Sequence, residues 1–313
     1  MNFQKQALNL TKQIPKGRIS TYGEIAKALG DVRASRAVGN ALNRNPKLIE
    51  IPCHRVVMSD GRIGGYSGGV ERKIELLEKE GVKIKDDKVL NFENILFKSG
   101  DFRADETGDK LEKLKKIQKE IKDKIILEDN FYEIKTIAGF DVSYGTENEA
   151  FGACVVFDYG TKGIIERETV KTKIDFPYIS TYLSFREFPV IEKLFKKLKN
   201  KPAILMIDGN GILHPRGVGI ASHAGVLLDT PAIGVAKTLL CGEVLGDKVI
   251  RGGKLIGNAL RSGKAKNPVY VSPGHKISFE TAVSLVRGFC KYRVPEPIRQ
   301  AHILAVKLKN QRN

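Results

Sequence analysis

The chain has 313 residues, an apolar fraction of 42% and a formal net charge of +17. This length predicts two domains, and the apolar fraction excludes a globally disordered chain. No run of about 18 apolar residues and no apolar N-terminal segment occur, so neither a membrane span nor a secretory signal is expected. Four scattered cysteines without a C-x-x-C pair argue against a disulfide framework and a cysteine-rich zinc site, and we expect a cytoplasmic location.

The positive charge is spread along the chain. Residues 1–98 hold 18 Lys and Arg against 11 Asp and Glu, and the remainder is basic as well. A spread positive field favours a polyanionic partner, nucleic acid first. A basic surface that only aids solubility is the alternative, and charge alone does not separate the two.

The first 98 residues are predicted to form a mainly helical domain. Thr21 and Glu24 have the spacing of a capping box, which marks the start of a helix. The expected elements are helices over 21–30, 35–45 and 72–80 and a flexible glycine-rich loop or wing over 61–69. Two short helices joined by a tight turn indicate a helix-turn-helix, whose second helix enters a DNA groove, although helical hairpins also occur in domains that never touch DNA.

A polar, glycine-punctuated stretch over 99–109 is predicted to be a linker, followed by a second domain over 110–313. Apolar spacing predicts a charged helix over 110–127. Expected strands are 136–142, 150–158, 164–171, 203–208, 232–236, 254–260 and 269–271, and expected helices are 188–198, 217–228, 279–292 and 297–309. Three successive strands followed by α/β alternation predict a mixed central sheet with helices on both faces.

The sharpest local feature of the first domain is Pro52-Cys53-His54-Arg55. A thiol beside an imidazole can be held as the nucleophilic thiolate if the surroundings favour the charge. The alternative is a buried, inert cysteine in an apolar run. The preceding helix-turn-helix and the basic domain around the motif favour the reactive cysteine.

Several separated blocks within residues 3–95 resemble the O6-alkylguanine-DNA alkyltransferases. They are Ser35-Arg36-Ala37-Val38-Gly39-Asn40, Pro52-Cys53-His54-Arg55 and Gly64-Gly65-Tyr66-Ser67-Gly68-Gly69. The resemblance implies a winged-helix-like domain in which Cys53 takes the alkyl group from guanine, irreversibly and without a cofactor. It also implies that the base is flipped out of the duplex, because a buried thiol cannot reach a stacked guanine.

The resemblance assigns further roles by position. His54 would polarise Cys53 through a water molecule, and Glu80 would orient His54. Tyr22 would help to rotate the nucleotide out, Arg36 would fill the gap, and Asn45 would be the hinge beside the active-site loop. Tyr66, Ser67 and Lys73 would line the alkylguanine pocket and donate to the departing guanine oxygen. Family members usually carry a further N-terminal domain, and we expect none here because the sequence starts almost at the helix-turn-helix.

In the second domain, three acids stand at informative places. Asp141 and Asp208 each end an apolar run, and Glu187 lies in Ser184-Phe185-Arg186-Glu187. A carboxylate in an apolar strand is costly unless it is paired or bound to a metal. Two such strands side by side would need a cation, and oxygen ligands favour Mg²⁺, with Mn²⁺ able to substitute. Metal-activated water would then hydrolyse a phosphodiester, whereas each acid alone can be a simple strand-end cap.

Blocks spanning about 110–310 resemble endonuclease V, including Ala138-Gly139-Phe140-Asp141, Asp208-Gly209-Asn210-Gly211 and Arg293-Val294-Pro295-Glu296. The resemblance implies an RNase H-like fold that cuts the second phosphodiester 3′ to hypoxanthine with a divalent metal. The implied metal ligands are Asp141, Glu187, Asp208 and His302. Lys237 would stabilise the scissile phosphate, and His214 would support the site or contact the product. Pro177, Tyr178 and Ile179 would form a wedge that fills the duplex where the flipped base leaves. The family often has a second proline where this chain has Ser180.

The combined expectation is a fused DNA-repair enzyme acting on double-stranded DNA that carries O6-alkylguanine or hypoxanthine. No membrane and no obligate protein partner is expected, and the chain should be a monomer. Two alternatives are a non-catalytic, lesion-sensing DNA-binding protein and a nuclease half that acts on inosine in RNA. The intact Cys53 and Glu80 argue against the first alternative.

Overall fold

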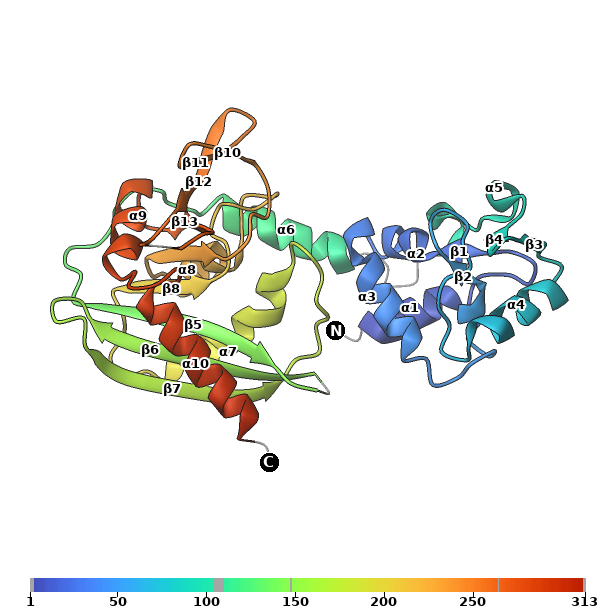
Figure 1. Ribbon diagram of the computed structural model, residues 1–313, viewed down its shortest axis with the longest axis horizontal. Helices are drawn as coiled ribbons and strands as arrows, with labels where there is room; N and C mark the ends of the chain where they lie inside the picture. The colour runs from blue at the N-terminus through green and yellow to red at the C-terminus, as the bar shows by residue number, and fades with distance from the viewer. Residues whose placement is uncertain (1–2, 104–109, 147, 264, 312–313) are drawn as a thin grey trace. The chain divides into compact units, whose positions relative to one another are not determined.

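The protein is described from a computed structural model, which defines residues 3–103, 110–146, 148–263 and 265–311 (Figure 1). It divides into two compact units, which are described separately. Unit 1 comprises Met1–Lys115 and Asp175–Ser180, and unit 2 comprises Lys116–Ile174 and Thr181–Asn313. No helix among the described residues is long and apolar enough to cross a membrane.

Unit 1 is mainly helical, as the sequence predicts. Its elements are α1 (Phe3–Thr11), β1 (Ser20–Thr21), α2 (Tyr22–Ala28), η1 (Val32–Ala34), α3 (Ser35–Asn43), η2 (Cys53–Arg55), β2 (Val56–Val57), α4 (Val70–Lys79), β3 (Ile84–Lys85), β4 (Lys88–Val89), α5 (Phe92–Ile95) and η3 (Ser99–Asp101). The short strands β1 and β2 pair in parallel, which places the residues after η2 beside the start of α2. The first helix, α1, is absent from the sequence-based expectation.

The predicted capping box of α2 forms only in part. Thr21 Oγ1 accepts a hydrogen bond from the backbone N of Glu24 at 3.0 Å, as expected of an N-cap. The Glu24 carboxylate instead accepts from the backbone N of Ser99 at 2.7 Å. The reciprocal bond to Thr21 is therefore replaced by one that holds η3 against α2.

The expected linker over 99–109 lies partly outside the described residues, which omit 104–109. The part that is described belongs to the fold of unit 1. Phe102 is buried and packs edge-on against Phe97, with ring centroids 4.8 Å apart, and Arg103 N donates to Gln13 Oε1. The division between the two units falls within α6 (Lys110–Lys122), whereas the sequence places the second domain from residue 110.

Unit 2 is built on a nine-stranded mixed sheet with the order β10-β11-β12-β13-β9-β8-β5-β6-β7. The strands are β5 (Thr136–Tyr144), β6 (Glu149–Asp158), β7 (Ile164–Lys173), β8 (Ile204–Asp208), β9 (Ala232–Ala236), β10 (Glu243–Leu245), β11 (Lys248–Arg251), β12 (Lys254–Leu260) and β13 (Val269–His275). The neighbours β5, β8 and β9 run parallel, and the other pairs are antiparallel. The predicted mixed central sheet is confirmed.

Helices cover both faces of this sheet (Figure 1). They are α7 (Leu183–Lys197), α8 (Ile220–Leu227), α9 (Phe279–Gly288) and α10 (Glu296–Asn310). Residues of α9 and α10 share a buried apolar cluster with Ile137 of β5 and Met206 of β8. On the opposite face, α7 packs on Gly152 of β6, which pairs with Val142 of β5. Because side chains alternate along a strand, Val142 points to the face opposite to that of Ile137.

Several sequence-based expectations differ from the structure in this unit: the charged helix expected over 110–127 ends at Lys122, and the helix expected over 279–292 ends at Gly288. Helix α7 begins at Leu183, five residues before the predicted start, and Pro189 lies inside it. The hairpin β10–β11 was not expected, because its residues are mostly exposed and carry no clear apolar alternation.

Candidate active sites

Unit 1 contains a pocket of about 340 Å³ that ends at Cys53. Its wall is formed by Tyr22, Gly39, Leu42, Asn43, Gly65, Tyr66 and Ser67. Gly39 of α3 faces the Tyr22 ring, and a Cβ there would lie 3.7 Å from it, at ordinary van der Waals distance. The structure thus brings two expected pocket residues, Tyr66 and Ser67, and the predicted nucleotide-rotating Tyr22 around the cysteine.

The thiol of Cys53 is held by the predicted hinge asparagine. Asn45 Nδ2 donates to Cys53 Sγ at 3.2 Å and to the Ile51 carbonyl at 3.0 Å. Burial raises the pKa of the Cys53 thiol, and the Asn45 amide and the charge of Lys73 oppose this only in part. The surroundings of Cys53 therefore favour the neutral thiol over a standing thiolate.

His54, Glu80 and Arg55 form a buried network behind the cysteine. His54 Nε2 lies 3.1 Å from Glu80 Oε1, and Arg55 donates to both carboxylate oxygens, at 2.8 Å and 2.6 Å. Burial lowers the pKa of His54, against the effect of Glu80. Burial alone would raise the pKa of Glu80, but hydrogen bonds from Arg55 and His54 bring it below its ordinary value. A neutral imidazole is thus oriented by a permanently charged carboxylate.

One expected pocket residue, Lys73, lies elsewhere, whereas Arg36 lies where the sequence places it. Lys73 is fully buried, and its ammonium donates to the carbonyls of Val56, Ile63 and Gly65 at 2.6, 2.7 and 3.2 Å, outside the pocket lining. Its three N–H groups are thereby used, so it ties the active-site loop together instead of facing a substrate. Arg36 is exposed at the start of α3, the second helix of the helix-turn-helix.

In unit 2, Asp141, Asp208 and Lys237 lie on three neighbouring strands: Asp141 within β5, Asp208 at the end of β8 and Lys237 just after β9. Phe140 of β5 pairs with Ile207 of β8, so the next residues along these parallel strands, Asp141 and Asp208, emerge side by side. Lys237 directly follows β9, and its Nζ lies 2.5 Å from Asp208 Oδ2. Burial, followed by the negative charge of Asp208, raises the pKa of Asp141 to about 6.

The helix α10 brings His302 to the same edge of the sheet. His302 Nδ1 lies 3.2 Å from Asp141 Oδ2. This approach depends on Gly139, because a Cβ there would lie 2.1 Å from the backbone of Pro297 at the start of α10. The glycine two residues before Asp141 therefore lets the helix that carries the histidine lie on the strand that carries the acid.

Glu187 reaches this edge from α7, on the opposite face. Its Oε1 accepts a hydrogen bond from the Tyr144 hydroxyl at 2.5 Å, and the Arg186 guanidinium lies 4.3 Å from the centre of the Tyr144 ring. Burial raises the pKa of Glu187 to about 8; the Tyr144 bond opposes this rise, and the charges of Asp208 and Asp141 add to it. Tyr144 is thus a direct partner of a predicted metal ligand.

The donor chemistry of these residues fits a hard divalent cation. Two carboxylates, Asp141 and Asp208, lie together with one ammonium nearby, and a divalent ion would relieve their repulsion. Among the described residues, however, no three His, Cys, Asp or Glu side chains are gathered closely enough to form a metal cluster. Glu187 is hydrogen-bonded to Tyr144 through one of its two carboxylate oxygens, and the charges of both aspartates act on it.

His214 and the expected wedge occupy distinct surroundings. His214 is buried; its Nε2 lies 3.2 Å from the Thr181 carbonyl, and its Nδ1 accepts from Arg216 N. Within the wedge segment, Tyr178 is 56% exposed, Pro177 is half-buried and Ile179 is buried. Of the three wedge residues, only Tyr178 is exposed enough to contact a substrate widely.

Sequence reasoning missed three residues of these networks. Arg55 anchors Glu80, Tyr144 binds Glu187, and Arg216 donates to Thr181 O and Oγ1 at 2.6 and 2.7 Å. Each stands within three residues of a predicted site residue in the sequence. Their nearness in sequence to predicted site residues could therefore have indicated them, but motif spacing does not show in which direction a side chain points.

Comparison with known proteins supports each half of the chain. The family model for endonuclease V matches residues 119–303, and that for the 6-O-methylguanine DNA methyltransferase DNA-binding domain matches residues 2–82. The endonuclease V family is generally metal-dependent. Solved structures similar to unit 2 include the catalytic domain of human endonuclease V, with 31% identity and a TM-score of 0.61, covering 67% of this chain and 98% of that one.

Another similar structure is Ciona intestinalis endonuclease V in complex with DNA that contains an inosine followed by a ribo-adenosine. It has 32% identity and a TM-score of 0.60, over 66% of this chain and 100% of that one. A bifunctional methyltransferase/endonuclease of Picrophilus torridus is 37% identical over 96% of this chain and 95% of its own length. A second, from Thermoplasma volcanium, is 38% identical over 95% and 87%. The chain belongs to this family of bifunctional methyltransferase/endonucleases, with an endonuclease V module in its second half.

Proposed function

We propose that unit 1 moves the alkyl group of O6-alkylguanine in double-stranded DNA irreversibly onto Cys53. The observation that carries this proposal is the pocket of about 340 Å³ that ends at the thiol and has two tyrosines in its wall. His54 Nδ1 is buried and has no hydrogen-bond partner among the described residues. That nitrogen is therefore free to take the thiol proton through a bridging water molecule.

The transfer balances without a cofactor. The Cys53 Sγ–carbon bond forms as the carbon–O6 bond breaks, and one proton passes overall from the thiol to the departing guanine. The buried Tyr66 hydroxyl has no hydrogen-bond partner among the described residues, which makes it the best-placed donor, with Ser67 beside it. Tyr22 and Arg36 would hold the flipped nucleotide and the gap it leaves, and Asn45 would keep the thiol in place.

The test is incubation of the full chain with duplex DNA that carries labelled O6-methylguanine. We expect one label per protein molecule, recovered on the peptide that contains Cys53 and absent from Cys53→Ser. A label that never appears on protein, or that still transfers to Cys53→Ser, would refute the proposal and favour a DNA-binding protein that only senses the lesion.

We propose that unit 2 cuts DNA at the second phosphodiester 3′ to hypoxanthine, with Mg²⁺ as its ion and Mn²⁺ able to substitute. Asp141 and Asp208 would hold the ion, with Glu187 and His302 completing the site directly or through water. When bound, the ion supplies an activated water and neutralises charge on the phosphate. Lys237, beside Asp208, would stabilise charge on the scissile phosphate, and Pro177, Tyr178 and Ile179 would fill the duplex where the base leaves. His214 would keep the substrate-facing loop in position through Thr181.

Matched inosine duplexes of DNA and of RNA test this proposal. Nicking of the DNA at the second phosphodiester, dependent on Mg²⁺, is the expected result. Faster cutting of the RNA would replace DNA by RNA as the substrate, an alternative made concrete by the ribo-adenosine in the Ciona complex. We further propose a monomer acting in the cytoplasm, a location that the four free cysteines support.

A further inference from the structure

Unit 2 has a pocket of about 510 Å³ whose lining includes none of the proposed metal-site residues. It lies between the β10–β11 hairpin, the end of β12, the start of β13 and helix α9 (Figure 1). Two arginines line it, Arg261 just after β12 and Arg287 in the last turn of α9, together with Tyr270 of β13. Asp247 is the single acid in the lining, so the pocket has an excess of positive charge.

The two arginines differ from others in the unit. Within the part of the chain that the structure describes, neither guanidinium of Arg261 or Arg287 has a hydrogen-bond or ion-pair partner. By contrast, Arg251 donates to the Pro215 carbonyl, and Arg299 forms an ion pair with Glu296. Two unpaired guanidinium groups that line one pocket present ten N–H donors, by the usual inventory, to whatever anion enters it.

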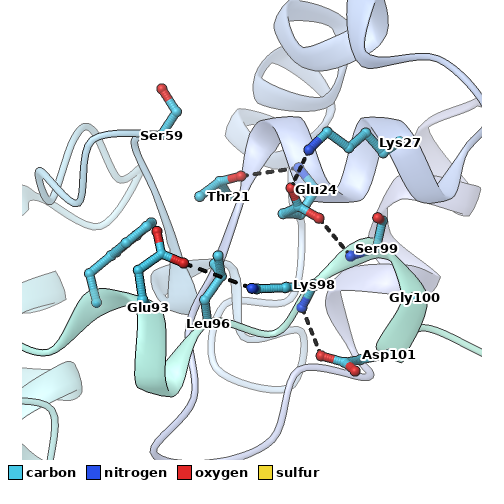
Figure 2. A pocket seen from close by; sticks show the side chains of 11 residues that line it. Thr21, Glu24, Lys27, Ser59, Glu93, Leu96, Lys98, Ser99, Gly100 and Asp101 are labelled. Atoms are coloured by element: carbon cyan, nitrogen blue, oxygen red, sulfur yellow. Dashed lines mark hydrogen bonds and ion pairs between the residues drawn. The ribbon is translucent and has the colours of Figure 1, made fainter.

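A pocket in unit 1 makes the contrast clear (Figure 2). Its lysines are already paired: Lys27 contacts Glu24 at 2.6 Å, and Lys98 Nζ lies 3.9 Å from Glu93. Its best acceptor, the Glu24 carboxylate, also binds Ser99 N. The charged groups that line that pocket are paired with one another, so they are not left available to bind a ligand.

The arginine pocket lies at the same edge of the sheet as the proposed metal site. Tyr270 pairs with Ala236, the residue before Lys237. One guanidinium, that of Arg293, donates both to the carbonyl of Lys237 at 2.5 Å and to that of Pro268, which lines the pocket, at 3.0 Å. Since neighbouring strands lie about 4.8 Å apart, the pocket begins roughly one to two strand spacings from the lysine.

That spacing suits a nucleic-acid backbone. Each strand of a duplex carries one phosphate per about 3.4 Å of helix axis, so a strand held at Lys237 places further phosphates within reach of the pocket. Arginine matches phosphate in a bidentate fashion, and a tyrosine hydroxyl can donate to the same group. We propose that Arg261, Arg287 and Tyr270 form a phosphate-binding subsite for the strand that is cut, an inference that rests on the proposed nuclease function.

The test compares the double variant Arg261→Ala/Arg287→Ala with wild type on an inosine duplex, in the full chain. Near physiological salt we expect KM to rise about ten-fold while kcat stays within about two-fold, because the subsite binds but does not react. The slope of log(kcat/KM) against log salt should fall in magnitude by about 2, one for each arginine removed from a phosphate. Arg167→Ala, an exposed arginine on the far edge strand β7, is the matched control and should leave both values unchanged.

Substrates with single uncharged methylphosphonates then locate the contact. Wild type should lose affinity at one or two positions near the cut, and the double variant should be insensitive there. Arg261→Lys/Arg287→Lys, which keeps the charge but not the planar fork, should fall between the two. A double variant that matches Arg167→Ala in KM, or that keeps the wild-type methylphosphonate pattern, overturns the subsite, and the pocket would then be free for another anion such as an acidic peptide.

Binding measured by fluorescence anisotropy in EDTA separates this proposal from the nuclease proposal. If wild type binds the duplex through the two arginines but never nicks it, the nuclease assignment fails and the subsite stands. If wild type nicks inosine DNA and the arginines affect neither binding nor KM, the subsite fails and the nuclease stands.

Discussion

The two active sites handle charge in opposite ways. Around Cys53 and His54, burial favours the uncharged forms of both groups, and the nearest carboxylate, Glu80, is paired with Arg55. At the sheet edge of unit 2, Asp141 and Asp208 are pressed together and Asp141 becomes harder to ionise. A nucleophile that reacts once can be generated by a single proton transfer, whereas repeated hydrolysis of a phosphodiester calls for a standing cluster of acids that a cation completes.

The largest expected effect, and the strongest test of this contrast between the two sites, comes from removing one of the two aspartates, Asp141 or Asp208. Asp141→Asn should lower the rate of nicking on the order of 10³-fold, because it removes an anionic ligand that would hold the divalent ion at the reacting phosphate. Alkyl transfer should be unchanged. Asp123→Asn, an exposed aspartate just beyond α6, is the control. Nicking within a few-fold of wild type in Asp141→Asn would contradict the metal-site assignment.

The buried lysine of unit 1 gives the next largest effect, on stability. Burial lowers the pKa of Lys73 to about 8, from 10.5. The unfolded chain therefore binds more protons between these two values, so unit 1 should gain up to about 3 kcal/mol as pH rises from 8 to 10.5. Urea unfolding at the two ends of this range measures the gain. Lys73→Met should lack it, and an equal gain in both proteins would show that the ammonium is not the source.

A third prediction concerns the orienting acid. Glu80→Gln should slow alkyl transfer about 100-fold, since His54 loses its charged partner and Arg55 is left without its carboxylate. The nicking rate should not move. Glu78→Gln, an exposed residue on the same helix, is the matched control. Transfer by Glu80→Gln at the wild-type rate would mean that the network is only structural.

The smallest expected effect lies at Tyr144. Tyr144→Phe removes the hydroxyl that binds Glu187, and we expect a roughly ten-fold loss of nicking together with a shift in the Mg²⁺ concentration that gives half the maximal rate. Tyr132→Phe, a fully exposed tyrosine, should change neither. If the nicking rate falls but the Mg²⁺ concentration that gives half the maximal rate is unchanged, Tyr144 contributes to packing and not to the position of Glu187.

The sequence predicted what periodicity and motif spacing can encode. The sheet, its strands around Asp141 and Asp208, and the helices flanking Cys53 follow from apolar patterns that report burial. Helix α7 was placed five residues too late, and it continues through Pro189, whose neighbours on both sides are helical. Apolar periodicity and motif spacing indicate secondary structure and burial, but they do not indicate which way a side chain points.

The partners of individual side chains are the part that the sequence could not supply. Lys73 was expected in the pocket, yet its long side chain turns inward to three carbonyls. Glu187 was expected to bind the metal directly or through water, and the sequence did not indicate that its carboxylate also accepts a hydrogen bond from Tyr144. Such choices depend on which polar groups become buried together, and residues distant in sequence decide that.

One measurement tests the central claim of two independent sites most directly. The full chain is incubated with a mixture of labelled O6-methylguanine duplex and inosine duplex, with Mg²⁺, as wild type, Cys53→Ser and Asp208→Asn. We predict that Cys53→Ser nicks at the wild-type rate without accepting label, and that Asp208→Asn accepts one label per molecule without nicking. Loss of both activities in either variant, or of neither, would contradict the account.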